Sequence, residues 1–426
     1  MRYKKIIDLE LGTNKFQAFV QNIRIKKNII FIIVNDISSE LQVTVLNKNE
    51  NLFNIASKLS IGSVINLEGE LVSNPNVILN QKEFLPTNIE IVNLAEELPI
   101  DENSLIDHKI KYRWIDLRTK KNQLMWKVQT TLAHAMREFC VDNELLEIHS
   151  PKIISTPSES GAEVFEVNYF DSKAYLAQSP QFYKQMALAA GFGGVFETGP
   201  VFRAENSNTH KHATEFTGFD VEISNIESVD DVIKFEEDLI AFAFAKVKAK
   251  YGEEIKKLFN IEFIVPTTPF PRMDLADVIK ELNQRYGYVL PESEHGDLPT
   301  EGEKLCRQLS LDMFGHEFLI VTGYDTKKRA FYHIRKDGIA QGYDLIWRGT
   351  EITTGAMREH RFNELSTQAR EKGLGKSIDF YLEFFKYGAP THGGFGIGLD
   401  RLTMLIFNKS IKESQFIFRG PKNLDP

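Results

Sequence analysis

The residues best suited to chemistry lie in a polar turn between two apolar stretches near the middle of the chain. Val201 and Phe202 precede the turn, apolar residues resume at position 216, and residues 206 to 214 are mostly Asn, Ser, Thr and His. Apolar segments on both sides of a polar turn predict a β-hairpin. Arg203 and Glu205, two positions apart, are expected to project from one strand face of this hairpin.

The side chains at the mouth of the hairpin suit an anionic, aromatic ligand such as a nucleotide. Arg203 would pair with phosphate oxygens, and Lys211 and His212 would lie over the same opening from the turn. Glu205 would accept a hydrogen bond from an amino group, and Phe216 would offer a stacking plane. Taken alone, the stretch is also compatible with an exposed hairpin that carries surface ion pairs.

A second polar stretch lies at residues 177 to 185. Ser179 is expected to cap a helix, and Pro180 is expected to occupy the first helical position. Gln181 and Lys184, three positions apart, would then share one face of that helix. An ammonium group beside an amide suits a small carboxylate ligand, although Lys and Gln are also common on ordinary helix surfaces.

A third stretch, residues 343 to 360, combines carboxylates, a hydroxyl group and arginines. Asp344, Glu351 and Thr354 offer the hard oxygen ligands that Mg²⁺ prefers, particularly when a triphosphate supplies further oxygens. Arg348 and Arg358 lie among these carboxylates. The sequence alone therefore leaves structural ion pairs open as an alternative.

Two stretches rich in small residues complete the candidate site. In the segment from His392 to Leu402, glycines allow a close approach of the backbone, and Arg401 is expected at the start of a helix, directed at a phosphate. The segment from Thr156 to Glu163 suits a flap over a ligand. A plain surface loop is the alternative for this second segment.

The N-terminal part of the chain predicts a small β-barrel. Alternating apolar residues indicate strands at 16–23, 29–34, 41–46, 64–71 and 89–92, with a helix at 52–59. Five strands with a helix between the third and fourth is typical of an OB-fold, which commonly binds single-stranded nucleic acid. Phe31 and Gln42 are candidates for base stacking and for contact with a base edge, or are plain sheet residues.

The larger C-terminal part predicts an α+β domain built on an antiparallel sheet with flanking helices. Apolar residues recur with helical spacing over residues 121–143, and further helices are expected near 232–248 and 378–385. Strands and helices do not alternate regularly, which argues against a doubly wound fold. An acidic segment with a proline at residues 95–102 indicates a hinge, so we expect domains at 1–97 and 116–426 joined by residues 98–115.

Composition places the chain among ordinary globular proteins. It has 426 residues, 42% hydrophobic and 26% charged, with a net charge of −8. No apolar run reaches membrane-spanning length, so we expect a cytoplasmic protein that does not contact the membrane. Cys140 and Cys306 lie far apart, which predicts neither a disulfide nor a zinc site. The first 35 residues are basic and either face phosphates or form a solvated surface.

Taken in order, these stretches resemble the three motifs of a class II aminoacyl-tRNA synthetase. The similarity is greatest to the aspartyl-tRNA synthetase family of the archaeal and eukaryotic type. It runs nearly end to end, through Arg113–Arg118, Ile148–Ile154, Gln178–Gln185, Phe202–Glu205 and the segment around Arg401.

The resemblance implies a role for each candidate residue. Arg203, Glu351 and Arg401 would be catalytic, and ATP would be held by Arg203, Glu205, Lys211, His212, Phe216, Glu351 and Arg401. Mg²⁺ would be held by Asp344, Glu351 and Thr354, and the amino acid by Glu159, Gln181, Lys184, Asp220 and Arg358. The anticodon of tRNA would contact Phe31, Gln42 and Glu90.

The implied activity is that of an aspartate–tRNA ligase, which uses ATP and Mg²⁺ to activate L-aspartate and transfers it to tRNA(Asp), with tRNA(Asn) as a second candidate acceptor. Three alternatives stay open: an asparaginyl enzyme, a paralogue that activates aspartate without charging tRNA, and an inactive RNA-binding relative. Lys184 favours aspartate because an ammonium group complements a carboxylate better than a neutral amide. The resemblance also implies a homodimer formed through the segment around Pro151.

Several positions depart from the family pattern. Lys211 stands where an arginine is usual, which removes a bidentate fork, and Asp400 replaces a glutamate. Thr354 stands in place of a serine, and the segment at 327–332 lacks its usual proline. The segment at 418–426 also lacks charged residues that are usual there. These departures leave the residues for activation intact and concern mainly the contacts with tRNA.

Overall fold

The computed structural model describes residues 3–157, 163–207 and 209–425. The chain forms two compact units, Met1–Arg118 and Thr119–Pro426. Helix α2 (Ile106–Lys111) lies within the segment expected to be a hinge, and helix α3 (Arg113–Asp116) extends one residue beyond it. The limits of 1–97, 98–115 and 116–426 stay a prediction about how the chain divides by function.

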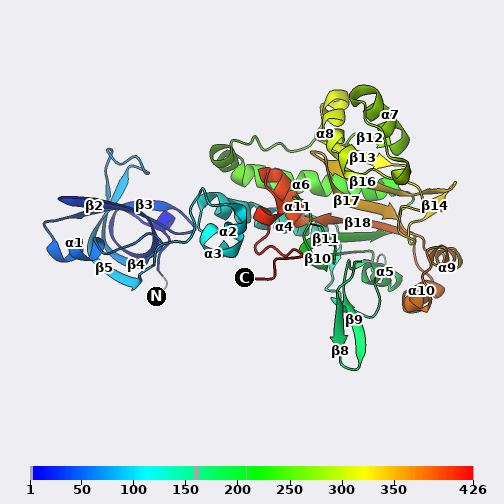
Figure 1. Cartoon of the computed structure of the whole chain (residues 1–426), viewed down its shortest axis with the longest axis horizontal. Helices are drawn as coiled ribbons and strands as arrows, with labels where there is room; N and C mark the ends of the chain where they lie inside the picture. Colours follow the sequence, from blue (N-terminus) through cyan, green and yellow to red (C-terminus); the bar gives the residue numbers. More distant parts are fainter. Residues whose placement is uncertain (1–2, 158–162, 208, 426) are drawn as a thin grey trace. The chain divides into compact units, whose positions relative to one another are not determined.

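The first unit is a closed five-stranded barrel, as the sequence predicted (Figure 1). Its strands follow the order β1-β2-β3-β5-β4. They comprise β1 (Gly12–Lys26), β2 (Ile29–Asn35), β3 (Glu40–Leu46), β4 (Val64–Ser73) and β5 (Lys82–Asn93), with helix α1 (Glu50–Ala56) between β3 and β4 and a short 3₁₀ turn at Ile6–Asp8. Alternate residues point inward, so that Phe16, Ala18 and Val20 of β1 are buried while the residues between them are exposed.

The second unit is built on an eight-stranded sheet in the order β12-β13-β16-β17-β18-β11-β10-β6. The strands are β6 (Leu146–Glu147), β10 (Gly194–Phe202), β11 (Glu215–Ser224), β12 (Arg272–Asp274), β13 (Phe318–Thr322), β16 (Gly342–Trp347), β17 (Thr350–Met357) and β18 (His392–Gly398). The central strands from β13 to β10 pair antiparallel, and the two short edge strands pair parallel. The predicted α+β class is confirmed.

Smaller elements surround this sheet. A three-stranded sheet contains β7 (Ile153–Ile154), β8 (Glu166–Tyr169) and β9 (Ser172–Leu176), and a two-stranded ribbon contains β14 (Arg335–Lys336) and β15 (Ile339–Ala340). The helices are α4 (Lys120–Asp142), α5 (Gln181–Ala189), α6 (Val229–Phe259), α7 (Leu275–Tyr286), α8 (Thr300–Phe314), α9 (Phe362–Glu371), α10 (Asp379–Lys386), α11 (Leu399–Phe407) and α12 (Ile411–Ser414), with 3₁₀ turns at Glu292–Glu294 and Lys376–Ile378.

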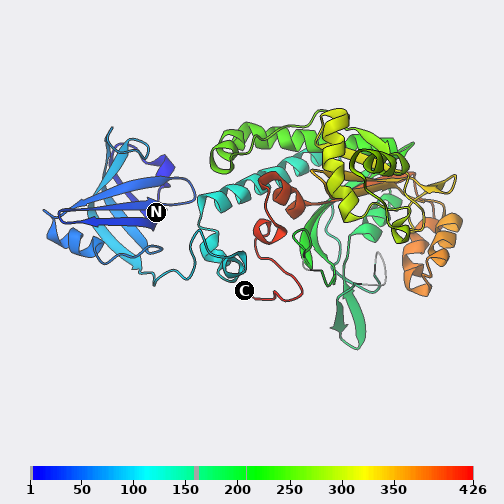
Figure 2. The same ribbon diagram turned by 45° about the horizontal axis from the view of Figure 1, so that its top comes forward.

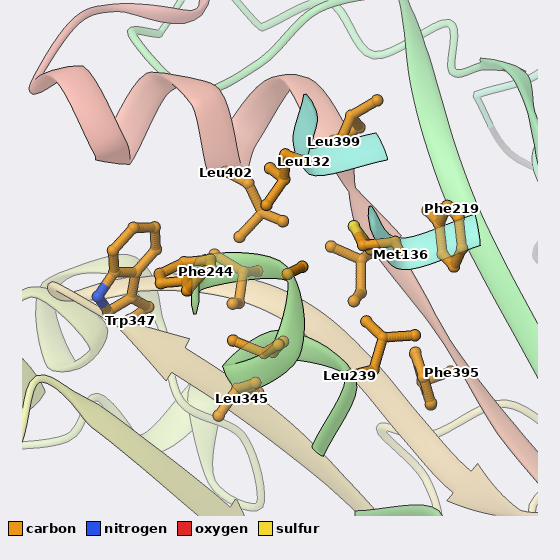
Figure 3. Packing of buried hydrophobic residues seen from close by; sticks show 14 of the residues in the cluster. Leu132, Met136, Phe219, Leu239, Phe244, Leu345, Trp347, Phe395, Leu399 and Leu402 are labelled. Carbon is orange, nitrogen blue, oxygen red and sulfur yellow. The ribbon is translucent and has the colours of Figure 1, made fainter. Parts of the chain in front are cut away.

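The main core lies between the sheet and the long helices α4 and α6, which run along the sheet together (Figures 1 and 2). Figure 3 shows Leu132 and Met136 of α4 packed with Leu239 and Phe244 of α6 and with Phe395 of β18. This apolar layer holds one face of the sheet rigid, so the opposite face and the strand ends are available for polar groups. No helix among the described residues is long and apolar enough to cross a membrane.

Three local predictions need correction. Strand β10 ends at Phe202, where it pairs with Glu215, so Arg203 and Glu205 lie in the turn and not on a strand face. Pro180 is the cap of α5 and not its first residue; Ser179 accepts the amide hydrogen of Gln181 at 3.3 Å. The glycine-rich segment, for which no strand was predicted, is strand β18, and the predicted helix α11 follows it directly.

Candidate active site

The hairpin of β10 and β11 places the nucleotide candidates at one end of the sheet. The backbone amide of Arg203 donates to the carbonyl of Thr214 at 2.9 Å, which closes the base of the turn. The guanidinium of Arg203 lies 5.5 Å from the ring centre of Phe216 and 3.9 Å from a carboxylate oxygen of Glu205. These three side chains therefore surround one small volume, as a base and a phosphate would require.

Residues predicted from distant stretches line a single cavity of about 470 Å³. Its walls include Gln181, Lys184, Arg203, Glu205, Lys211, His212, Phe216, Asp220, Glu351, Thr354, Arg358 and Arg401. Asp344 is buried behind this wall, where its carboxylate accepts a hydrogen bond from Thr354. Glu159 lies outside the described residues. Burial lowers the pKa of His212, so this ring is neutral at neutral pH.

The inner end of the cavity holds a buried cluster of two cations and two carboxylates. The ammonium of Lys184 is 2.9 Å from Asp220 and 3.4 Å from Glu222, with 1% of its side chain exposed. The guanidinium of Arg358 is 2.9 Å from Glu222 and also donates to the carbonyl of Gly394 at 2.8 Å. Arg358 and Lys184 keep the pKa of Glu222 below its usual range despite complete burial. Both cations therefore have a fixed carboxylate partner.

Glycines in β18 make room for these carboxylates. A Cβ at Gly394 would lie 2.4 Å from a carboxylate oxygen of Glu222, and one at Gly396 would lie 2.9 Å from Asp220. Any larger residue would push the acidic side chains out of place. The glycine-rich pattern read from the sequence thus serves close packing of β18 against β11.

The opposite wall carries the predicted metal ligands. The hydroxyl of Thr354 donates to Asp344 at 2.9 Å and lies 3.2 Å from Glu351. Burial and the charge of Asp344 raise the pKa of Glu351 to about 7. A cation between the two carboxylates would remove this repulsion, so the donor set fits Mg²⁺. No cluster of three acidic, His or Cys side chains suited to a metal occurs in the described chain, so phosphate and water would complete the shell.

Arg329 is a site residue that sequence reasoning missed. It forms a two-pronged ion pair with Asp344, and its guanidinium stacks 3.5 Å from the ring centre of Tyr324. The charge of Asp344 raises the pKa of Arg329 above its already high value, against the opposing effect of burial. Arg329 therefore fixes the orientation of Asp344, and a lone arginine ahead of Ala330 gave no signal of this contact.

Lys211 differs from its predicted position over the open mouth of the cavity. Its ammonium lies 2.8 Å from Glu303 of α8, and the lysine and the glutamate are both 9% exposed. Glu303 also accepts the backbone amide of Glu351 at 3.1 Å. Glu303 therefore joins the turn after β10 to strand β17, and Lys211 is held in this pair at the cavity wall.

Comparison with known proteins agrees with this geometry. The sequence profile described as tRNA synthetases class II (D, K and N) matches residues 106–417, and the profile of an OB-fold nucleic acid binding domain matches residues 15–92. The chain belongs to the class II tRNA synthetases. Relatives of this synthetase include an aspartate–tRNA(Asp/Asn) ligase of Aeropyrum pernix, 37% identical over 93% of this chain and 91% of the relative. An aspartate–tRNA(Asp) ligase of Pyrococcus furiosus is also 37% identical, over 97% and 96%.

Solved structures resemble this synthetase over the whole chain. The asparaginyl-tRNA synthetase of Pyrococcus horikoshii, complexed with asparaginyl-adenylate, superposes with a TM-score of 0.92 at 27% identity and covers 100% of both chains. An aspartyl-tRNA synthetase of Entamoeba histolytica gives a TM-score of 0.87 at 29% identity, covering 100% of this chain and 93% of the other. Since both amino-acid types share the fold, specificity must be argued from the side chains of the cavity.

The barrel of this synthetase brings some of the predicted anticodon residues together. Phe31 pairs with Thr44 across β2 and β3, and Gln42 donates to the hydroxyl of Thr44 at 3.3 Å. Gln42 also pairs with Glu83 of β5, whose carboxylate accepts from Thr44 at 2.7 Å. These residues form one polar patch on the outer face of the barrel, to which Glu83 contributes a carboxylate that the sequence did not indicate.

Glu90 does not belong to this patch. It lies seven residues beyond Glu83 along β5, which corresponds to roughly 23 Å of strand. Its carboxylate accepts instead from Asn66 of β4 at 2.9 Å. Glu83 was missed because its closeness to Gln42 depends on the parallel pairing of β3 with β5, which no local pattern reveals.

Proposed function

We propose that this synthetase is an aspartate–tRNA ligase that forms aspartyl-adenylate from L-aspartate and ATP and transfers the aspartyl group to tRNA(Asp). One observation carries the proposal. A single cavity combines groups suited to a nucleotide, at Arg203, Glu205 and Phe216, with two buried cations, Lys184 and Arg358. A dicarboxylic amino acid beside ATP satisfies both ends of this cavity.

Each substrate group has a matching partner in the proposed complex. Lys184 and Arg358 bind the side-chain carboxylate of aspartate, Asp220 binds its ammonium group, and Gln181 assists. A role of Glu159 at the ammonium end stays a prediction. Phe216 stacks on adenine, and Glu205 accepts from the adenine amino group. Arg401, His212 and Lys211 contact the outer phosphates.

Activation needs no nucleophilic side chain from the protein. An oxygen of the substrate α-carboxylate attacks the α-phosphorus of ATP, a new O–P bond forms, and the bond to the bridging oxygen breaks so that pyrophosphate leaves. Arg203 donates to the α-phosphate oxygens on which charge accumulates, and Arg401 stabilises the departing phosphates. Catalysis is therefore positioning combined with charge stabilisation, as the cavity provides.

Asp344, Glu351 and Thr354 would hold Mg²⁺ in this proposal. When bound, the ion neutralises phosphate charge and orients the triphosphate. Arg329, on the cavity wall, holds both carboxylate oxygens of Asp344, so Glu351 and Thr354 line the cavity and Asp344 lies behind them.

The second reaction requires tRNA. The terminal 3′-end hydroxyl of tRNA attacks the aspartyl carbonyl carbon, the mixed-anhydride bond breaks and AMP leaves. The patch of Phe31, Gln42 and Glu83 on the barrel offers an aromatic plane, an amide and a carboxylate to unstacked anticodon bases. We infer that Glu83, and not Glu90, completes this contact.

Asparagine is the competing substrate, because asparaginyl enzymes share the fold. Lys184 argues against it, since a buried ammonium group complements the side-chain carboxylate of aspartate better than the neutral amide of asparagine. Charging of tRNA(Asn) with aspartate is a separate matter. The Aeropyrum pernix relative carries both acceptors in its name, whereas the Pyrococcus furiosus relative carries tRNA(Asp) alone.

Two assays test the function. ATP–pyrophosphate exchange with aspartate and with asparagine measures activation, and aminoacylation of tRNA(Asp) and tRNA(Asn) measures transfer. We expect exchange with aspartate and charging of tRNA(Asp). Exchange without charging of either tRNA would identify a paralogue, faster exchange with asparagine would identify an asparaginyl enzyme, and absence of exchange would exclude both enzymatic assignments.

We further infer a cytoplasmic homodimer. Exposed apolar side chains recur in the segment from the end of α4 to β7, where Val141, Leu146 and Ile153 are each at least 50% exposed and Pro151 is also exposed. Such a patch suits a self-complementary interface. Light scattering after size exclusion is expected to give twice the chain mass, and Leu146→Asp is expected to give the monomer. Cytoplasmic location follows from the proposed role in protein synthesis.

A further inference from the structure

Behind the amino-acid end of the cavity lies a chain of hydrogen bonds centred on Gln185 of α5. Its side-chain oxygen accepts from the amide of Gln181 at 3.0 Å and from the hydroxyl of Tyr381 at 2.8 Å. Its side-chain nitrogen lies 2.9 Å from Nε2 of His392, whose Nδ1 lies 2.8 Å from the carbonyl of Pro390. Gln185, Tyr381 and His392 are each completely buried. We call these three residues the Gln185 network.

The direction of every hydrogen bond in the network follows from one carbonyl group. The oxygen of Pro390 can only accept, so Nδ1 of His392 carries the proton that it receives. Burial lowers the pKa of His392, so the ring is neutral and its Nε2 accepts. Gln185 must then direct its NH₂ group at His392 and its oxygen at Tyr381 and Gln181.

This polarity fixes the orientation of Gln181 as well. The oxygen of Gln185 accepts, so Gln181 must donate with its own NH₂ group. The acceptor that Gln181 can offer in the cavity is therefore its carbonyl oxygen. Without Gln185, the amide could turn by half a rotation and offer NH₂ in its place, since the two orientations are nearly equal in shape.

We propose that Gln185, Tyr381 and His392 are positioning residues that hold the carbonyl oxygen of Gln181 toward the ammonium group of the amino-acid substrate. The inference rests on the proposed function, since it assigns a recognition role within the same site. An ammonium group is only a donor, so an NH₂ group in this place would repel it. Asp220 then supplies the charge, and Gln181 supplies a neutral acceptor of defined direction.

The test compares two substitutions at Gln185 with one nearby control. Gln185→Met keeps the volume and removes the acceptor, and is expected to raise KM for aspartate about three- to tenfold, the worth of one neutral hydrogen bond. KM for ATP is expected to stay within about twofold, since the adenine and phosphate contacts are unchanged. Gln185→Glu retains an acceptor for Gln181 and is expected to restore KM for aspartate toward the original value.

Met186→Ala is the matched control, because Met186 neighbours Gln185 on α5 but is 41% exposed and lies outside the Gln185 network. Equal increases of KM for aspartate in Gln185→Met and Gln185→Glu would show that the acceptor offered to Gln181 does not matter, and would overturn the inference. An unchanged KM in both would show that Gln185 only fills space, and would overturn it as well. So would an equal rise in KM for aspartate and ATP. If the unaltered enzyme shows no aspartate-dependent exchange, the proposed function itself fails.

A spectroscopic measurement addresses the network without activity. Nitrogen NMR of the imidazole is expected to show His392 in the neutral form with its proton on Nδ1. The same signal is expected in Met186→Ala. A proton on Nε2 of His392 in the unaltered protein would reverse the direction of the hydrogen bonds in the Gln185 network and contradict the inference.

Discussion

Replacement of Lys184 by methionine tests how the cavity selects its amino acid. Methionine has a similar length, so Lys184→Met removes the charge while retaining most of the volume. In the folded protein the ammonium is 1% exposed, 2.9 Å from Asp220 and 3.4 Å from Glu222. The substitution therefore removes a donor that a substrate carboxylate would meet in an enclosed, water-poor space.

The size of the effect follows from the value of a hydrogen bond to a charged group. Such a bond contributes about 1.5–3 kcal/mol, which corresponds to a loss of about 10- to 150-fold in kcat/KM for aspartate. Asparagine presents a neutral amide and loses less, so the preference for aspartate is expected to fall by at least about tenfold. KM for ATP is expected to change little, because the proposed nucleotide contacts, Arg203 and Phe216, do not include Lys184.

Pyrophosphate exchange with both amino acids is the assay, and thermal unfolding is the check on folding. Removal of one partner of a buried ion pair destabilises proteins by about 3–5 kcal/mol, so rates must be related to the folded fraction. Lys234→Met, at a lysine with a 75% exposed side chain on α6, is the control. The reasoning is refuted if kcat/KM for aspartate stays within twofold, or if aspartate and asparagine decline in parallel.

Three further predictions concern the rest of the site. Arg203→Ala is expected to lower the exchange rate about 100-fold or more through loss of a transition-state donor, with an unchanged melting temperature because its side chain is 44% exposed. Acidification from pH 8 to pH 6 is expected to raise the Mg²⁺ concentration needed for half-maximal exchange. The pKa of Glu351 is raised to about 7, so this carboxylate becomes protonated over that range and the proton competes with the ion. A Mg²⁺ requirement that does not change with pH would contradict this. Phe31→Ala and Glu83→Gln are each expected to raise KM for tRNA(Asp) about tenfold and to leave pyrophosphate exchange unchanged. Glu90→Gln is the control and is expected to leave KM for tRNA(Asp) unchanged. An equal effect of all three substitutions would refute the proposed binding of tRNA by the barrel patch.

Local patterns in the sequence predicted most of the elements. Alternation of apolar residues located all five barrel strands, because one face of each strand is buried in the closed barrel. The prediction for β5, at 89–92, missed the first part of the strand, which begins at Lys82. Helical spacing identified α4 to within one residue at each end. The polar turn marked the β10–β11 hairpin, but the end of β10 at Phe202 depends on pairing with Glu215 and was placed too late.

Contacts between distant segments could not be predicted in the same way. Glu303 lies 92 residues from Lys211 in the chain and meets it only because α8 lies against β17. Arg329 contacts Asp344, 15 residues further along the chain, and no motif marks it. Glu303 and Arg329 hold the predicted residues in place, and their identity depends on the packing and not on the spacing of the sequence.

The balance of charge at the inner end of the cavity explains why Glu222 is as important for selectivity as the two cations that it contacts. Lys184 and Arg358 together carry two positive charges, and a substrate carboxylate supplies only one negative charge. Without Glu222, one buried cation would lack compensation, and a divalent anion such as phosphate would fit better than an amino acid. With Glu222 in place, one positive charge is left for the side-chain carboxylate of aspartate, while Asp220 balances the ammonium group. Selectivity for a side chain with a single negative charge therefore requires Glu222, which is buried and does not itself line the cavity.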